Sequence, residues 1–118
     1  MTKEILMSDA FVWFHNSSNK PNESKAFYEK LLGWKTSDGP GGMTMFGGEK
    51  GPFAAVGAKE GDEAGWLPYV QVDDVDAATK KAVKLGAALV KEKSRGPAGE
   101  FSIVRDPGGA TIALWQKA

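Results

Sequence analysis

The sequence predicts an α+β fold built from two tandem βαβββ modules. Three observations support this prediction. An apolar strand precedes each of two helix-like segments, three strand-like pieces follow each of them, and short motifs recur in both halves. A chain of 118 residues suits a single domain, residues 1–118, with module one at about 8–58 and module two at about 65–117.

The first helix is predicted within "KPNESKAFYEKLLG". Phe27 and Leu31 lie four residues apart, with Tyr28 and Leu32 beside them, and these four residues form an apolar stripe. Pro21 suits a first helical turn, and Gly33 suits the position just after the last turn. A lysine precedes Pro21 where an aspartate or serine would be expected, so Asn19 is predicted to cap the helix.

The second helix is predicted within "DDVDAATKKAVKLG". Asp73 or Asp74 would cap its start, and Gly86 would end it. Its apolar residues recur at helical spacing and would face a sheet. They are Val75, Ala78, Ala82 and Leu85.

The two halves repeat each other in short motifs as well as in element order. "LLGW" begins at residue 31 and "KLGA" at residue 84, while "GPGG" begins at 39 and "GPAG" at 96. The offsets are therefore 53 and 57 residues, from 84 − 31 and 96 − 39. Similarity at a nearly fixed period indicates a duplicated unit, although Leu-Gly and Gly-Pro pairs also recur by chance.

Composition excludes several classes of partner. Lys and Arg number 15, as do Asp and Glu, so the chain has no basic excess of the kind that nucleic-acid binding needs. There is no Cys, which excludes disulfides and thiol catalysis and suits a reducing compartment. No apolar run has the length of a membrane span or a signal peptide. We therefore expect a cytoplasmic protein without nucleic-acid or membrane partners.

Three stretches resemble a known group of proteins: "AFYEKLLGW", "YVQVDDVDAA" and "RDPGGATIALW". They are similar to the glyoxalase, bleomycin-resistance and extradiol-dioxygenase group, the vicinal oxygen chelate superfamily, and most of all to its bacterial glyoxalase-like branch. The resemblance implies curled sheets that face each other around a cleft, with the helices outside. It also implies a homodimer, because members of this group often pair.

Members of the group use the cleft in two ways, and the resemblance locates the positions that distinguish them. Enzymes hold a divalent metal with one ligand from the first strand and one from the last strand of each module, whereas drug-binding members hold their ligand without a metal. Counting along the family pattern places three of the four ligand positions at Trp13, Leu67 and Ala113. Applying the offset of 57 residues to Ala113 gives Val56 as the fourth. None of these side chains offers a lone pair suited to a divalent metal. We therefore predict no metal and no cofactor.

Strand alternation predicts which side chains line the cleft. They form an aromatic wall with few polar groups, a composition typical of small-molecule sites. The same aromatic rings would equally serve as core. The predicted ligand-binding residues are Phe11, Trp13, His15, Tyr69, Gln71 and Trp115, with Glu100 at the mouth.

His15 is the only histidine in the sequence. A histidine at a strand end is most often bonded to backbone or water. The functional alternatives are a ligand contact, a general base or a lone metal ligand.

These observations leave three hypotheses for the function. The first is a metal-free small-molecule binding protein. The second is a lyase, isomerase or dioxygenase-type enzyme of the same superfamily that uses a shifted metal site or none. The third is a regulatory module without a ligand. The vacant ligand positions weigh against chemistry that needs a metal to polarise an oxygen, so binding is favoured.

Overall fold

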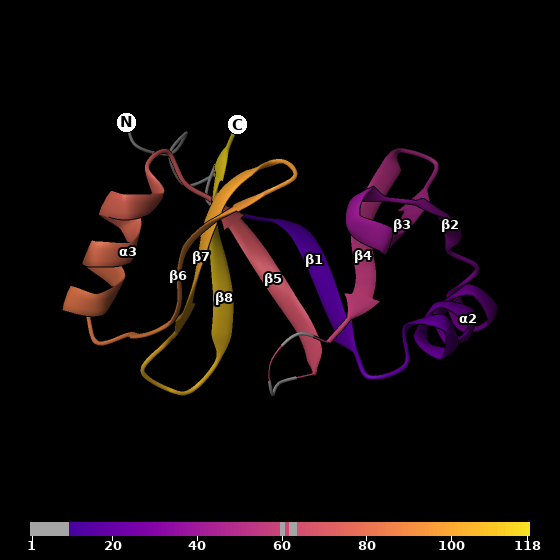
Figure 1. Cartoon of the computed structure of the whole chain (residues 1–118), viewed down its shortest axis with the longest axis horizontal. Helices are drawn as coiled ribbons and strands as arrows, with labels where there is room; N and C mark the ends of the chain where they lie inside the picture. The colour runs from indigo at the N-terminus through magenta and orange to yellow at the C-terminus, as the bar shows by residue number, and fades with distance from the viewer. Residues whose placement is uncertain (1–9, 60, 62–63) are drawn as a thin grey trace. The chain divides into compact units, whose positions relative to one another are not determined.

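A computed structural model describes residues 10–59, 61 and 64–118. The order strand, helix, strand, strand, strand occurs twice along the chain, as predicted, and the fold class is α+β (Figure 1). In the first βαβββ segment, a short 3₁₀ turn at Pro40–Gly42 separates two of the strands. Its elements, module one, are β1 (Phe11–Ser18), α2 (Pro21–Leu32), β2 (Lys35–Asp38), β3 (Thr44–Gly48) and β4 (Gly51–Ala58).

The second βαβββ segment has the same order and similar element lengths. No helix in the described ranges is long and apolar enough to cross a membrane. The elements of this segment, module two, are β5 (Gly65–Gln71), α3 (Val75–Lys84), β6 (Ala88–Gly96), β7 (Gly99–Arg105) and β8 (Thr111–Lys117).

The chain forms two compact units whose boundaries cut through β1 and β5. One unit is Trp13–Leu67, and the other is Pro68–Ala118 together with the described residues up to Val12. The first residues of β5, including Trp66, therefore pack with module one.

Helix α2 begins at Pro21, as predicted, and ends before Gly33. Gly33 adopts the left-handed conformation with φ of 72°, which glycine accepts without steric cost. The prediction that Asn19 caps this helix is wrong. The residue at the cap position is Lys20, and its side chain makes no capping hydrogen bond, so Pro21 supplies the start signal by fixing its own φ.

The buried side of α2 matches the predicted apolar stripe in one residue. Tyr28 packs against the core, whereas Phe27, Leu31 and Leu32 are exposed. Tyr28 stacks on Trp34 with ring centroids 5.4 Å apart and an interplanar angle of 12°. The core beneath the helix consists of Phe46, Ala54 and Val56, with Tyr28, Trp34 and Phe53 around it.

Helix α3 has the capping side chain that α2 lacks. The Ala77 N–H donates to Asp74 Oδ1 at 3.1 Å, which settles the choice between Asp73 and Asp74. A second polar contact joins the start of the helix to the last strand, because the Val75 N–H donates to Gln116 Oε1 at 2.8 Å. Helix α3 is thereby fixed to β8 at the level of its first turn.

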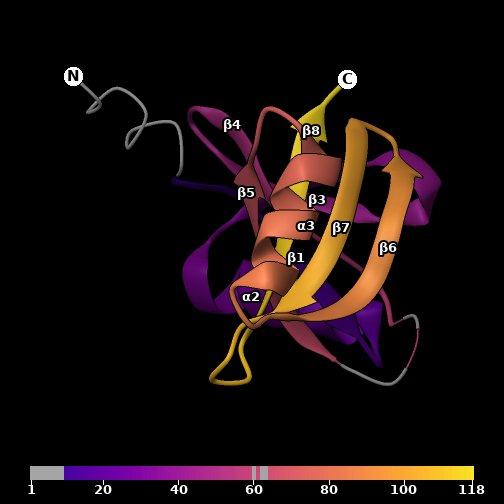
Figure 2. The same ribbon diagram turned by 90° about the vertical axis from the view of Figure 1, so that its left-hand side faces the viewer.

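The eight strands belong to one mixed sheet, to which each module contributes one parallel pair and two antiparallel pairs. The strand order is β2-β3-β4-β1 in module one and β5-β8-β7-β6 in module two. The parallel pairs are β1 with β4 and β5 with β8. In Figure 2, α3 lies across one face of the module two sheet, with β6 at its edge.

The core of module two lies between α3 and this sheet. Val75, Val104 and Leu114 are buried there. The hydroxyls of Thr79 on α3 and of the fully buried Ser102 on β7 are hydrogen-bonded at 2.7 Å. This bond satisfies two polar groups that would otherwise be costly in an apolar layer.

Burial of Phe46 predicts a large loss of stability when the ring is removed. The side chain is fully buried, so Phe46→Ala should lower the free energy of unfolding by about 3–5 kcal/mol. Leu31 is 62% exposed, and Leu31→Ala should change it by less than about 1 kcal/mol. Chemical denaturation of both variants measures the difference. Equal losses would contradict the packing described for α2.

Candidate functional site

Module two presents one sheet face to α3 and leaves the other without a helix; we call the latter the helix-free face. Ile112 and Leu114 of β8 point toward α3, so Ala113 and Trp115 lie on the helix-free face by alternation. Residues paired directly across neighbouring strands share a face. Tyr69 pairs with Ala113 and Gln71 pairs with Trp115. Three of the predicted ligand-binding residues, Tyr69, Gln71 and Trp115, are thus on one surface.

A phenylalanine and a lysine that the sequence reasoning missed complete this surface. Phe101 of β7 pairs with Trp115, and its ring centroid is 6.1 Å from that of Tyr69. The ammonium nitrogen of Lys91, on β6, lies 5.3 Å from the centroid of the Phe101 ring, within cation–π range. Burial raises the pKa of the Tyr69 hydroxyl above its usual 10.0, because the anion would lose hydration.

The helix-free face of module one carries the histidine. His15 pairs with Ala55, and Ala55 pairs with Met45 on the other side. The neighbouring Gly57 lies under the imidazole, since a Cβ at that position would be 3.5 Å from His15 Cε1. Alternation along β1 puts Trp13 on the same face, half-buried.

Phe11 begins β1 and is 53% exposed. Alternation along the strand gives its side chain the same direction as those of Trp13 and His15. It belongs to the unit of Pro68–Ala118, whereas Trp13 and His15 belong to the other unit.

Val56 is not on a helix-free face, and its prediction as a ligand position is wrong. It is 2% exposed and belongs to the core under α2. The register gives the equivalent residue directly. The parallel pair His15–Ala55 in module one matches the pair Tyr69–Ala113 in module two, so Ala55 is the counterpart of Ala113.

The corrected set of positions still lacks metal ligands. It consists of Trp13, Ala55, Leu67 and Ala113, none of which has a donor atom in its side chain suited to a divalent ion. No Asp or Glu occupies a paired strand position on the helix-free face of either module. Within the described ranges, no three His, Asp or Glu side chains are grouped as a metal site would require. These side chains do not fit the metal that the fold's enzymes use.

Glu100 lies on the opposite side of the module two sheet from Trp115. It pairs with Gln116, whose amide oxygen bonds the first turn of α3, so both side chains are on the helix side. Its carboxylate lies 3.6 Å from the guanidinium of Arg95. The strand register therefore does not support the expectation that Glu100 lies at the mouth of a cleft with Trp115.

A family model matches most of the chain. The model described as Glyoxalase/Bleomycin resistance protein/Dioxygenase superfamily aligns with residues 17–114. The chain belongs to this superfamily. The resemblance noted in the sequence is thereby confirmed.

Two known proteins are similar to this chain in sequence. The protein named "Putative glyoxylase CFP32" of Mycobacterium tuberculosis is 34% identical over 115 residues, covering 88% of this chain and 44% of that protein. "Anthracycline biosynthesis protein DnrV" of Streptomyces peucetius is 29% identical over 126 residues, covering 89% of this chain and 46% of that protein. The chain thus spans less than half the length of either relative.

A solved structure shows the same fold at low sequence identity. It is that of a glyoxalase/bleomycin resistance protein/dioxygenase superfamily member from Vibrio splendidus 12B01. The TM-score is 0.64 at 15% identity, covering 90% of this chain and 97% of that chain.

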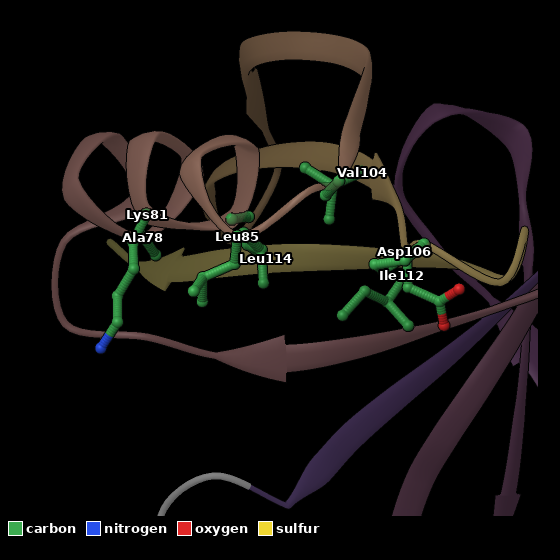
Figure 3. Close-up of a pocket in the computed structure, with 10 residues that line it drawn as sticks. Ala78, Lys81, Leu85, Val104, Asp106, Ile112 and Leu114 are labelled. Carbon is green, nitrogen blue, oxygen red and sulfur yellow. The ribbon is translucent and has the colours of Figure 1, made fainter.

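Two apolar hollows lie on the helix sides of this superfamily fold. A groove of about 330 Å³ runs beneath α3, with Leu85, Ile112 and Leu114 along it and Lys81 pointing outward (Figure 3). A second hollow of about 310 Å³ is lined by Phe14, Trp34, Phe53, Ala54 and Trp66. Trp34, which lines this second hollow, also stacks on Tyr28 of α2.

The raised pKa of Tyr69 predicts a pH-dependent loss of stability. The unfolded chain releases the phenolic proton near pH 10.0, whereas the folded chain holds it to higher pH. The folded state therefore binds more protons above that pH, and stability falls as pH rises. Tyr69→Phe should remove part of this fall, measured by urea denaturation at neutral and alkaline pH. An unchanged alkaline slope would contradict the burial of the hydroxyl.

Proposed function

We propose that this chain is a metal-free small-molecule binding protein of the glyoxalase and bleomycin-resistance fold. The observation that carries the proposal is the content of the two helix-free faces. They hold aromatic side chains and a histidine near the four positions where enzymes of this fold hold metal ligands, and those four positions, Trp13, Ala55, Leu67 and Ala113, offer no metal-binding side chain. We propose Phe11, Trp13, His15, Tyr69, Gln71 and Trp115 as ligand contacts, with Phe101 added from the structure.

The arrangement on module two supports binding of a flat apolar group. Trp115 lies between Phe101 and Gln71 across three neighbouring strands. All three side chains are half-buried rather than fully buried, so each retains surface that a ligand would cover. Apolar walls with a few polar groups combine affinity with orientation.

We propose a cytoplasmic homodimer as the working form. The relatives are more than twice as long as the matched segment, so each has room for a second unit of this size. Phe27 and Leu31 on α2 also leave an apolar surface exposed, which a second copy would cover.

An enzyme of the same superfamily is the alternative. The name of the mycobacterial relative, a glyoxylase, favours it at 34% identity. In that case His15 is the side chain on the helix-free faces best suited to acid–base work or to a shifted metal site. Lyase, isomerase or dioxygenase-type chemistry would then need donors that the four corrected positions do not supply.

A ligand should stabilise the protein through Trp115. At a concentration one hundred times its dissociation constant, a flat aromatic compound should add about 2.7 kcal/mol to the free energy of unfolding. Trp115→Ala should abolish this gain, while Trp34→Phe, on the helix side of module one, should retain it. Thermal melts with and without ligand separate the two effects.

Trp115→Phe serves as a second variant because it keeps the strand packed, and it should weaken the gain without a large fall in the unliganded melting temperature. If no compound in a broad screen of metabolites and drugs shifts the melting temperature of the parent protein, the regulatory-module hypothesis replaces the binding hypothesis.

Metal addition should leave the protein unchanged. Stoichiometric Zn²⁺, Mn²⁺ or Ni²⁺, and EDTA in a parallel sample, should not shift the melting temperature, because the corrected positions offer no ligand atoms. The enzyme alternative predicts the opposite. A metal-dependent rise that His15→Ala removes, with isomerase or lyase activity appearing alongside, would establish it.

A further inference from the structure

Charge is divided unequally between the two faces of the module two sheet. On the helix side, cations are paired with carboxylates: Lys93 Nζ lies 2.9 Å from Asp76 Oδ2, and Arg95 lies 3.6 Å from Glu100. The remaining acidic side chains of this module lie around the start of α3 or in the Asp106 turn. Glu92 is the exception, in an irregular part of β6 to which the pairing assigns no face.

The helix-free face presents lysines among its aromatic side chains. Strand pairing places Lys117 opposite Gly99 and Lys91 opposite Ile103 on this face. Among the described strand residues of module two, no Asp or Glu holds a paired position there. In a chain with equal numbers of acidic and basic residues, the paired positions described on this face are therefore locally positive.

The aromatic side chains lie beside these cations rather than apart from them. The Lys91 ammonium is over Phe101, Phe101 is next to Tyr69, and Trp115 pairs with Phe101. Neighbouring strands are about 4.8 Å apart, so β6 and β5 are separated by about 14 Å. A ring system over Trp115 and Tyr69 would bring a substituent at its end within reach of Lys91.

We infer that the ligand of this face is a flat aromatic molecule that carries an anionic group, with the rings on Tyr69, Phe101 and Trp115 and the anion at Lys91. The inference rests on the proposed binding function and names its ligand class. An aromatic cation would meet like charges at Lys91 and Lys117. A neutral molecule would bring no negative charge to the Lys91 ammonium, which lies over the ring of Phe101.

Three probes with the same ring system test the inference: naphthoate, naphthamide and the naphthylmethylammonium cation. Isothermal titration at about 50 mM and about 0.5 M salt should show naphthoate binding most tightly. It should lose affinity in high salt because exposed charges are screened. The cation should bind weakest.

The matched variants are Lys91→Gln and Lys93→Gln, which lie two residues apart on opposite sides of the sheet. Lys91→Gln should weaken naphthoate binding about threefold to tenfold and leave naphthamide binding unchanged. Lys93→Gln should leave both unchanged. Melting temperatures of the free variants confirm that each is folded.

Two results would overturn the inference, and they differ in what they say of the proposed function. Equal binding of naphthoate and naphthamide, lost in Trp115→Ala, would leave a binding protein whose ligand is not selected by charge. Equal effects of the two lysine variants would likewise remove Lys91 from the site. Binding of none of the three probes would count against both the inference and the proposed function.

Discussion

The alternation of side chains along each strand is the constraint on which the rest of this structure depends. Each module sets one sheet face against a helix and fills the space between with apolar groups. The other face is then free to carry residues chosen for reasons other than packing. Because the period is two, a single residue of displacement moves a side chain from one role to the other.

Much of the fold follows from local signals in the sequence. Element order, the start of α2 at Pro21 and the end of α2 at Gly33 agree with the structure. The faces of β8 were also predictable, because side chains alternate along a strand and only one phase puts both Ile112 and Leu114 under α3. The cap of α2 was not predictable from residue type, because proline alone starts that helix.

The candidate site was predicted less completely, and for physical reasons. The offset of 57 came from motifs in hairpin turns, whereas the paired strands require 113 − 55, or 58. One extra residue reversed the face and exchanged Ala55 for Val56. Lys91 was missed because β6 has register shifts on both sides of it, so alternation along that strand does not hold.

Those shifts in β6 have a consequence for the protein before it meets any ligand. β6 ends the module two sheet, and a straight terminal strand offers unpaired backbone groups to a strand from another molecule. Bulges disturb the spacing of these groups, and the sequence "KEK" within the strand adds charges that would have to be brought together. The same irregularity that prevents Lys91 from being placed by alternation therefore also protects this edge strand from pairing with strands of other molecules and so from aggregation.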